Sequence, residues 1–144
     1  MIEAHALWTD KERFVGEASS GHAIVTDAGS EKSANSPVEL VLIALCACTA
    51  SDVVGILRKK REPFTSLDVR AIGERAETFP KIYTNIRLIY RVGGNVTHKA
   101  MEDAVRLSKE KYCSVSQMLQ KSVKIDYEIE YAETHQHEKL PDAK

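Results

Sequence analysis

The sequence lacks a surplus of charge of either sign. Its 144 residues carry 20 lysines and arginines against 21 aspartates and glutamates, and the formal net charge at pH 7 is -1. Because the two signs are interspersed along the chain, no long-range field would steer a polyanion or an anionic membrane toward it. We therefore expect no nucleic-acid partner, and we expect a ligand that is small and not highly charged.

Cysteine is scarce, and a targeting signal and a long apolar run are missing. Three cysteines, an odd number, are too few for the disulfide framework of a secreted protein, so free or reversibly oxidised thiols are expected. The first nine residues carry Glu3 and His5 where a secretory segment needs a basic start and an apolar run. The longest apolar stretch, residues 40–50, is about half of the roughly 20 residues that a bilayer requires. We expect a cytoplasmic protein without a membrane span.

The composition that remains is typical of one globular domain. Apolar residues make up 43% of the chain and charged residues 28%, and a chain of this length can bury a core without disulfides or metal. We predict a single domain over residues 5–132 and a flexible polar tail over residues 133–144. His135 and His137 lie in that tail, where an unstructured end is favoured over a metal site. No metal and no cofactor are expected.

The first third of the sequence predicts short strands that lead into a long helix. Segments at residues 4–8, 13–18 and 22–26 are separated by polar or glycine-containing turns, which is typical of an antiparallel meander. A capping box then begins at Ser36, with Pro37 at the first helical position and Glu39 three residues after the cap.

This predicted helix should run through the middle of the fold. Apolar residues recur every three or four positions as far as Leu57, and the first half of the segment is apolar almost all round. The basic run at residues 58–61 suits the negative end of the helix dipole, and we interpret it as the helix end rather than a binding patch. The remaining elements are predicted as strands at residues 66–77 and 82–92, a helix at 97–111, a short helix from Ser114 and a strand at 123–132.

The three cysteines lie in different local contexts. Cys48 is on the inner side of the long helix, where a cysteine is more often a small core residue than a catalyst. Cys113 directly precedes a second capping-box pattern, residues 114–117, so its thiol should face unpaired backbone N–H groups that favour the thiolate. Cys46 is two residues from Cys48, hence about 200° away around the helix, and we assign it to packing.

The segments around Cys48 and Cys113 resemble those of the OsmC/Ohr family. The similar segments are Ser36-Pro37-Val38-Glu39-Leu40, followed by Ala44-Leu45-Cys46-Ala47-Cys48-Thr49-Ala50, and then Lys111-Tyr112-Cys113-Ser114-Val115. In this resemblance Cys48 stands at the reactive position and Cys113 at that of the second cysteine. Asp52-Val53-Val54 is similar to the YhfA-like branch of the family.

The resemblance implies a fold and a mechanism. The fold is α+β, with an antiparallel sheet wrapped around a long central helix in an intertwined homodimer, and a symmetric partner would cover a helix that is apolar all round. Cys48 would reduce a small peroxide and become a sulfenic acid, and Cys113 would close a disulfide onto it. An external dithiol would reset the pair. An arginine from the N-terminal strands would activate Cys48; Arg13 is the first candidate and Arg75 the second.

One departure from the family and two alternative functions accompany this interpretation. Val38 occupies the position of the family's glutamate, and the capping box explains the neighbouring Glu39, so we expect either a weaker peroxidase or a thiol protein with another oxidant. One alternative is a non-catalytic module that binds an apolar small molecule at the dimer interface. The other is a purely structural dimer. A role in the oxidative stress response would follow from the peroxidase alone.

Overall fold

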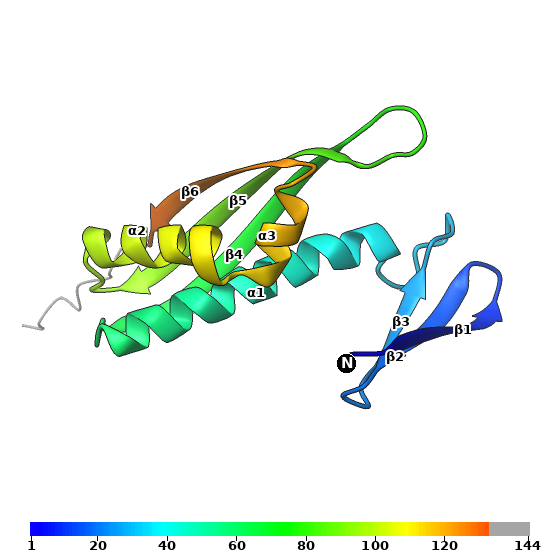
Figure 1. Cartoon of the computed structure of the whole chain (residues 1–144), viewed down its shortest axis with the longest axis horizontal. Coiled ribbons are helices and arrows are strands. Elements are labelled where there is room, and N and C mark those ends of the chain that lie inside the picture. The colour runs from blue at the N-terminus through cyan, green and yellow to red at the C-terminus, as the bar shows by residue number, and fades with distance from the viewer. Residues whose placement is uncertain (133–144) are drawn as a thin grey trace, which may run out of the picture. The chain divides into compact units, whose positions relative to one another are not determined.

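The computed structural model describes residues 1–132, which group into two compact units, Met1–Ala44 and the residues from Leu45 onward (Figure 1). The expectation of a single domain over residues 5–132 stays a prediction. The predicted tail at 133–144, with its two histidines, lies outside the described residues.

The first unit holds a three-stranded antiparallel sheet in the order β1-β2-β3, as the meander pattern predicts. Its strands are β1 (Ala4–Asp10), β2 (Arg13–Ala18) and β3 (Ala23–Asp27).

Apolar side chains lie on both faces of this sheet. Leu7 pairs with Val15 of β2, so these two share one face, and Trp8 is directed to the other face because side chains alternate along a strand. Leu7 is 65% exposed and Trp8 is 62% exposed. The sheet therefore presents apolar surface to its surroundings on two sides.

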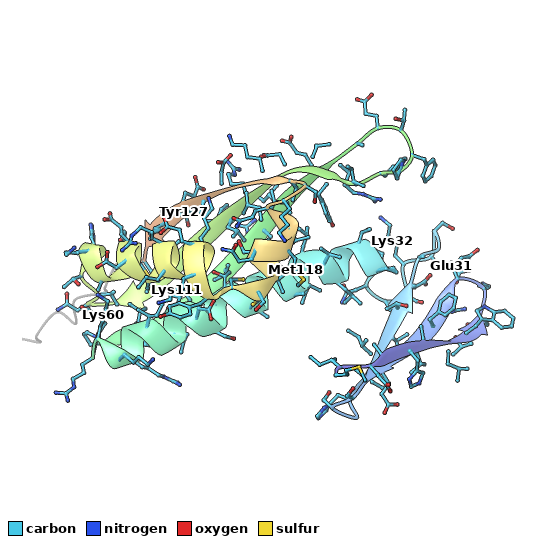
Figure 2. All side chains as sticks on the ribbon, viewed as in Figure 1. Glu31, Lys32, Lys60, Lys111, Met118 and Tyr127 are labelled. Atoms are coloured by element: carbon cyan, nitrogen blue, oxygen red, sulfur yellow. The ribbon has the colours of Figure 1, made fainter. Side chains whose placement is uncertain are left out.

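The long helix α1 (Pro37–Lys59) begins with the predicted capping box. The backbone N–H of Ser36 donates to Glu39 Oε2 at 2.7 Å, and the N–H of Glu39 donates to Ser36 Oγ at 3.3 Å. The helix buries one stripe of residues spaced four apart: Leu45, Thr49, Val53 and Leu57. Beyond its end, Lys60, which Figure 2 labels, forms an ion pair with Asp103 at 3.4 Å.

Much of the apolar surface of α1 stays uncovered within the chain. Among the described residues, α1 is the one helix whose length and apolar composition would allow it to cross a membrane. The buried core helices of globular proteins have the same two properties. Only 22% of its most apolar stretch is buried, and Ile43 is 48% exposed. Residues 40–50 are the central part of this longer helix, and the expectation that the chain has no membrane span stays a prediction.

The second unit contains a three-stranded sheet in the order β4-β5-β6. Its strands are β4 (Phe64–Arg75), β5 (Tyr83–Gly94) and β6 (Lys124–Tyr131), close to the predicted positions. β4 and β5 are antiparallel, whereas β5 and β6 are parallel, so this sheet is mixed rather than purely antiparallel. The helical segment between β5 and β6 makes the crossover that a parallel pair requires.

That crossover is where the fold departs most from the expected elements. The α-helix α2 (His98–Leu107) continues directly into a π-helix, η1 (Ser108–Tyr112), and a short helix, α3 (Ser114–Leu119), follows after Cys113. A single α-helix over residues 97–111 was expected instead. π-helical turns are rare and often lie at functional sites, so the position of η1 directly before Cys113 indicates a functional role for this segment.

Candidate active site

The structure brings Cys48 and Cys113 together. Cys48 lies on α1 and is half-buried, whereas Cys113 lies between η1 and α3 and is 0% exposed. Their side chains lie close enough that Cys48 raises the pKa of the Cys113 thiol. Two thiols that are 65 positions apart in the sequence thus meet inside the second unit, with Cys48 on the side from which solvent can reach it.

The sulfur of Cys113 itself caps α3. Cys113 has an extended backbone, and its Sγ accepts a hydrogen bond from the N–H of Ser116 at 3.3 Å. The predicted capping box from Ser114 to Gln117 is wrong, because the cap lies one residue earlier. The Gln117 amide instead donates to the carbonyls of Lys109 and Glu110, both at 2.9 Å, and so ties α3 to the π-helix.

Burial controls the protonation of Cys113. Desolvation raises the pKa of the Cys113 thiol to about 12, the N–H of Ser116 acts in the opposite direction, and Cys48 and the charge of Asp52 raise it further. The expectation that this helix terminus favours a thiolate is therefore wrong for this state. A helix of six residues offers one N–H to the sulfur, and this does not offset the loss of water.

A chain of buried hydroxyl groups joins the elements that carry the two cysteines. Thr49, next to Cys48 on α1, lies with its Oγ1 2.7 Å from the hydroxyl of Tyr90 on β5 and 2.8 Å from Oγ of Ser108. Ser108 Oγ donates to Asp52 Oδ2 at 2.9 Å. The carbonyl of Ser108 accepts the N–H of Cys113 at 2.8 Å. Sequence reasoning missed this network; the only available signal was a polar threonine on the buried stripe.

Cys46 lies in a different environment from Cys48. It is half-buried and receives a backbone hydrogen bond from Ala71 on β4. Burial, and then the charge of Asp68, raise the pKa of the Cys46 thiol. This placement is consistent with the packing role assigned from the helical spacing. Within residues 1–132, no group of three or more histidines, cysteines or acidic residues is arranged to hold a metal ion.

The two arginine candidates are both engaged in local contacts. Arg13 binds the carboxylate of Asp10 through two hydrogen bonds, from Nε at 2.9 Å and from Nη2 at 2.7 Å, and its Nη1 donates to Ser33 Oγ at 3.4 Å. Arg75 Nε donates to the carbonyl of Lys81 at 2.7 Å. The role of either arginine in activating Cys48 stays a prediction.

A cavity of about 210 Å³ lies on α1 one turn beyond Cys48. Its lining residues come from α1 and from the residue before Cys113: Ser51, Asp52, Gly55, Ile56, Lys59 and Tyr112. Gly55 opens onto free space, because a Cβ at this position would meet no atom within 4 Å. Ser51, Asp52 and Gly55 lie three, four and seven positions after Cys48, so the cavity lies on the same face of the helix as Cys48.

A family model described as OsmC-like protein matches residues 29–128 of the chain. The chain belongs to the OsmC-like protein family. The recognition made from the cysteine segments is confirmed, and so is the α+β OsmC-like fold.

Relatives of known sequence or structure cover nearly all of this OsmC-like chain. Protein YhfA of Escherichia coli strain K12 is 42% identical over 130 residues, which cover 90% of this chain and 97% of that protein. The crystal structure of a hypothetical protein from Aquifex aeolicus VF5 is 35% identical, with a TM-score of 0.80 and coverage of 92% of this chain and 98% of that one. An organic hydroperoxide resistance protein OsmC from Legionella pneumophila shares the fold, with a TM-score of 0.69 at 16% identity over 90% of this chain and 96% of that one.

Proposed function

We propose that this chain is a thiol redox protein that reduces hydroperoxides through a sulfenic acid and disulfide cycle of Cys48 and Cys113. The observation that carries the proposal is the proximity of the two thiols, which is close enough for Cys48 to shift the pKa of Cys113. Membership of the OsmC-like family supports a redox role, and one structural neighbour is described as an organic hydroperoxide resistance protein.

The exposure of the two cysteines supports the order proposed for them in the cycle. The more accessible Cys48 attacks the terminal oxygen of the hydroperoxide as a thiolate; the O–O bond breaks, an alcohol or water leaves, and Cys48 becomes a sulfenic acid. The buried Cys113 then attacks that sulfur, the S–O bond breaks, and the departing hydroxide takes a proton to form water. An external dithiol reduces the disulfide and returns both thiols.

The proposed active form is a homodimer. Two observations support it: α1 leaves most of its apolar stretch uncovered, and the β1-β2-β3 sheet has apolar side chains on both faces. A symmetric second copy would bury both surfaces at once, whereas a monomer would leave them in water. We further propose a cytoplasmic location, because the cytosol keeps thiols such as Cys48 and Cys113 reduced between cycles.

Activation of Cys48 is assigned to Arg13 in this proposal. A nearby cation stabilises a thiolate nucleophile. The family resemblance implies that an arginine of the N-terminal strands supplies this cation, and Arg13 lies on β2, one of those strands. With valine at position 38 in place of a carboxylate, the arginine lacks that orienting partner. We therefore expect organic hydroperoxides to be reduced more slowly than in relatives that carry the glutamate.

Thiol mapping before and after one equivalent of hydroperoxide tests the cycle. The wild type should form a Cys48–Cys113 disulfide, and Cys113→Ser should instead retain a sulfenic acid on Cys48 that a dimedone probe labels. Cys46→Ser is the matched control and should behave as the wild type. Stopped-flow oxidation no faster than that of free cysteine would refute the peroxidase, and a small molecule retained on Cys48→Ser would favour the binding module instead.

A further inference from the structure

Ser108 connects the helix of Cys48 with the backbone of Cys113. Its Oγ lies 2.8 Å from Thr49 and 2.9 Å from Asp52, which are one and four positions after Cys48 on α1. Its carbonyl accepts the N–H of Cys113 at 2.8 Å. One residue, fully buried, therefore fixes the segment that carries the second thiol against the helix that carries the first.

The hydrogen bonds of this network have a defined direction. The carboxylate of Asp52 can only accept, so the single proton of the Ser108 hydroxyl points to Asp52. The Thr49 hydroxyl must then donate to Ser108, and the Tyr90 hydroxyl must donate to Thr49. Each hydroxyl group in this network thus donates one hydrogen bond, and the last acceptor is the charged carboxylate of Asp52. A charged acceptor in a buried setting strengthens the hydrogen bonds that lead to it.

The π-helix makes such an anchor necessary. η1 begins at Ser108 and ends at Tyr112, directly before Cys113, so any shift in the start of η1 displaces the thiol. A disulfide forms only when the two α-carbons lie within about 4.4–6.8 Å and the Cβ vectors converge. Misplacement of a reacting group by about 1 Å can lower a rate by about a hundredfold.

We propose that Ser108 and Asp52 are positioning residues that hold Cys113 in register with Cys48, so that a sulfenic acid on Cys48 is captured as a disulfide. The inference rests on the proposed cysteine cycle, and it identifies residues that control the rate of its second step, the formation of the disulfide. The role proposed for both residues does not require contact with the peroxide. They act on the closure step alone, in which the Cys113 sulfur replaces the sulfenic hydroxyl group and water is released.

The test uses the full chain in a Cys46→Ser background, with Ser108→Ala compared with Ser122→Ala. Ser122 is an exposed serine that donates to the carbonyl of Leu119, so the control removes the same hydroxyl group outside the network. Equilibration with a glutathione redox buffer gives the effective concentration of the two thiols, and this readout needs no peroxide. Dimedone trapping after one equivalent of hydrogen peroxide gives the lifetime of the sulfenic acid.

Ser108→Ala is expected to lower the effective concentration of the two thiols by about tenfold or more. The lifetime of the sulfenic acid should lengthen by the same factor. The rate of the first oxidation should stay within about twofold of the wild-type rate. Ser122→Ala should match the wild type in all three. A folded Ser108→Ala with the effective concentration of the wild type overturns the proposal.

Asp52 provides the second pair of variants, which keeps the test decisive if Ser108→Ala does not fold. Asp52→Ala removes the acceptor of the Ser108 hydroxyl at a half-buried position, whereas Asp52→Asn keeps an oxygen there. The alanine variant should lose effective concentration, and the asparagine variant should restore most of it; an unchanged Asp52→Ala overturns the inference. A wild type that forms the disulfide in glutathione buffer but does not react with peroxide would refute the peroxidase and leave the positioning role intact.

Discussion

The hydroxyl of Tyr90 and the hydroxyl of Thr49 lie 2.7 Å apart, and both residues are 1% exposed. Burial raises the pKa of Tyr90 to about 12, so the phenol keeps its proton at neutral pH and donates it to Thr49. A polar contact of this kind at the centre of an apolar core is stabilising only while both partners are present. It also connects β5 to α1 next to Cys48.

This pair predicts a measurable coupling energy. Thr49→Val should lower the free energy of unfolding by about 1–3 kcal/mol, because the Tyr90 hydroxyl loses its buried acceptor. Urea denaturation of Thr49→Val, Tyr90→Phe and the double variant gives the coupling. The double variant should lose less stability than the two single losses added together, and strict additivity would contradict the bond.

Alkaline pH should destabilise the reduced protein through Cys113. The pKa of its thiol is raised from 9.0 to about 12, so the folded state holds the proton more tightly than the unfolded state does. This contribution is fully present below pH 9 and is lost as the pH rises from 9 toward 12. Unfolding in urea at pH 8, 9.5 and 10.5 under a reductant should show the decline, and Cys113→Ala should show a shallower one. Equal slopes would mean that the thiol is not buried in solution.

Acid should destabilise the first unit through Asp27. The Ser33 hydroxyl, followed by the backbone N–H groups of Ser33 and Gly29, lowers the pKa of the Asp27 carboxyl to about 2. A depressed folded pKa stabilises the protein above pH 3.8, and this stabilisation is lost as the pH falls toward 2. Asp27→Asn should flatten the loss of unfolding free energy between pH 4 and 2.5. Glu128→Gln, which removes a carboxylate at an exposed position of β6, serves as the matched control.

A charge on the uncovered face of α1 should separate the proposed dimer. Ile43 is 48% exposed in the single chain, so Ile43→Asp adds little strain to the folded monomer. At a dimer interface the same carboxylate would be buried without a partner, which costs several kcal/mol. Sedimentation should therefore show monomers for Ile43→Asp and dimers for Ser122→Asp, which makes the same charge change on an exposed serine. Dimers for both variants would place the interface elsewhere.

The local elements of the fold were predictable from sequence, and the reasons are visible at Ser36 and Leu45. The capping box at Ser36 depends on residues three positions apart, and the four-residue spacing from Leu45 to Leu57 marks the buried stripe directly. The long-range contacts were not predictable from sequence. Ser108 is hydrogen-bonded to Thr49, 59 positions earlier, and a π-helix of five residues is too short to have a periodicity that would indicate this contact.

The thiol pair lies between these two cases. Local pattern gave each cysteine a helix and a plausible task, but their pairing came from family resemblance, and the protonation of Cys113 was predicted with the wrong sign. The sign depends on how completely the surrounding chain removes water from the sulfur, which is a property of the packed structure.

The sulfur of Cys113 also caps the N-terminus of α3 by accepting the N–H of Ser116. In the proposed cycle this sulfur changes oxidation state, and it is also the acceptor that caps a helix, so disulfide formation and helix formation would share a single thermodynamic cycle. Conditions that favour the ordered turn must shift the midpoint potential of the pair, and a change in potential must, in equal measure, tighten or loosen that turn.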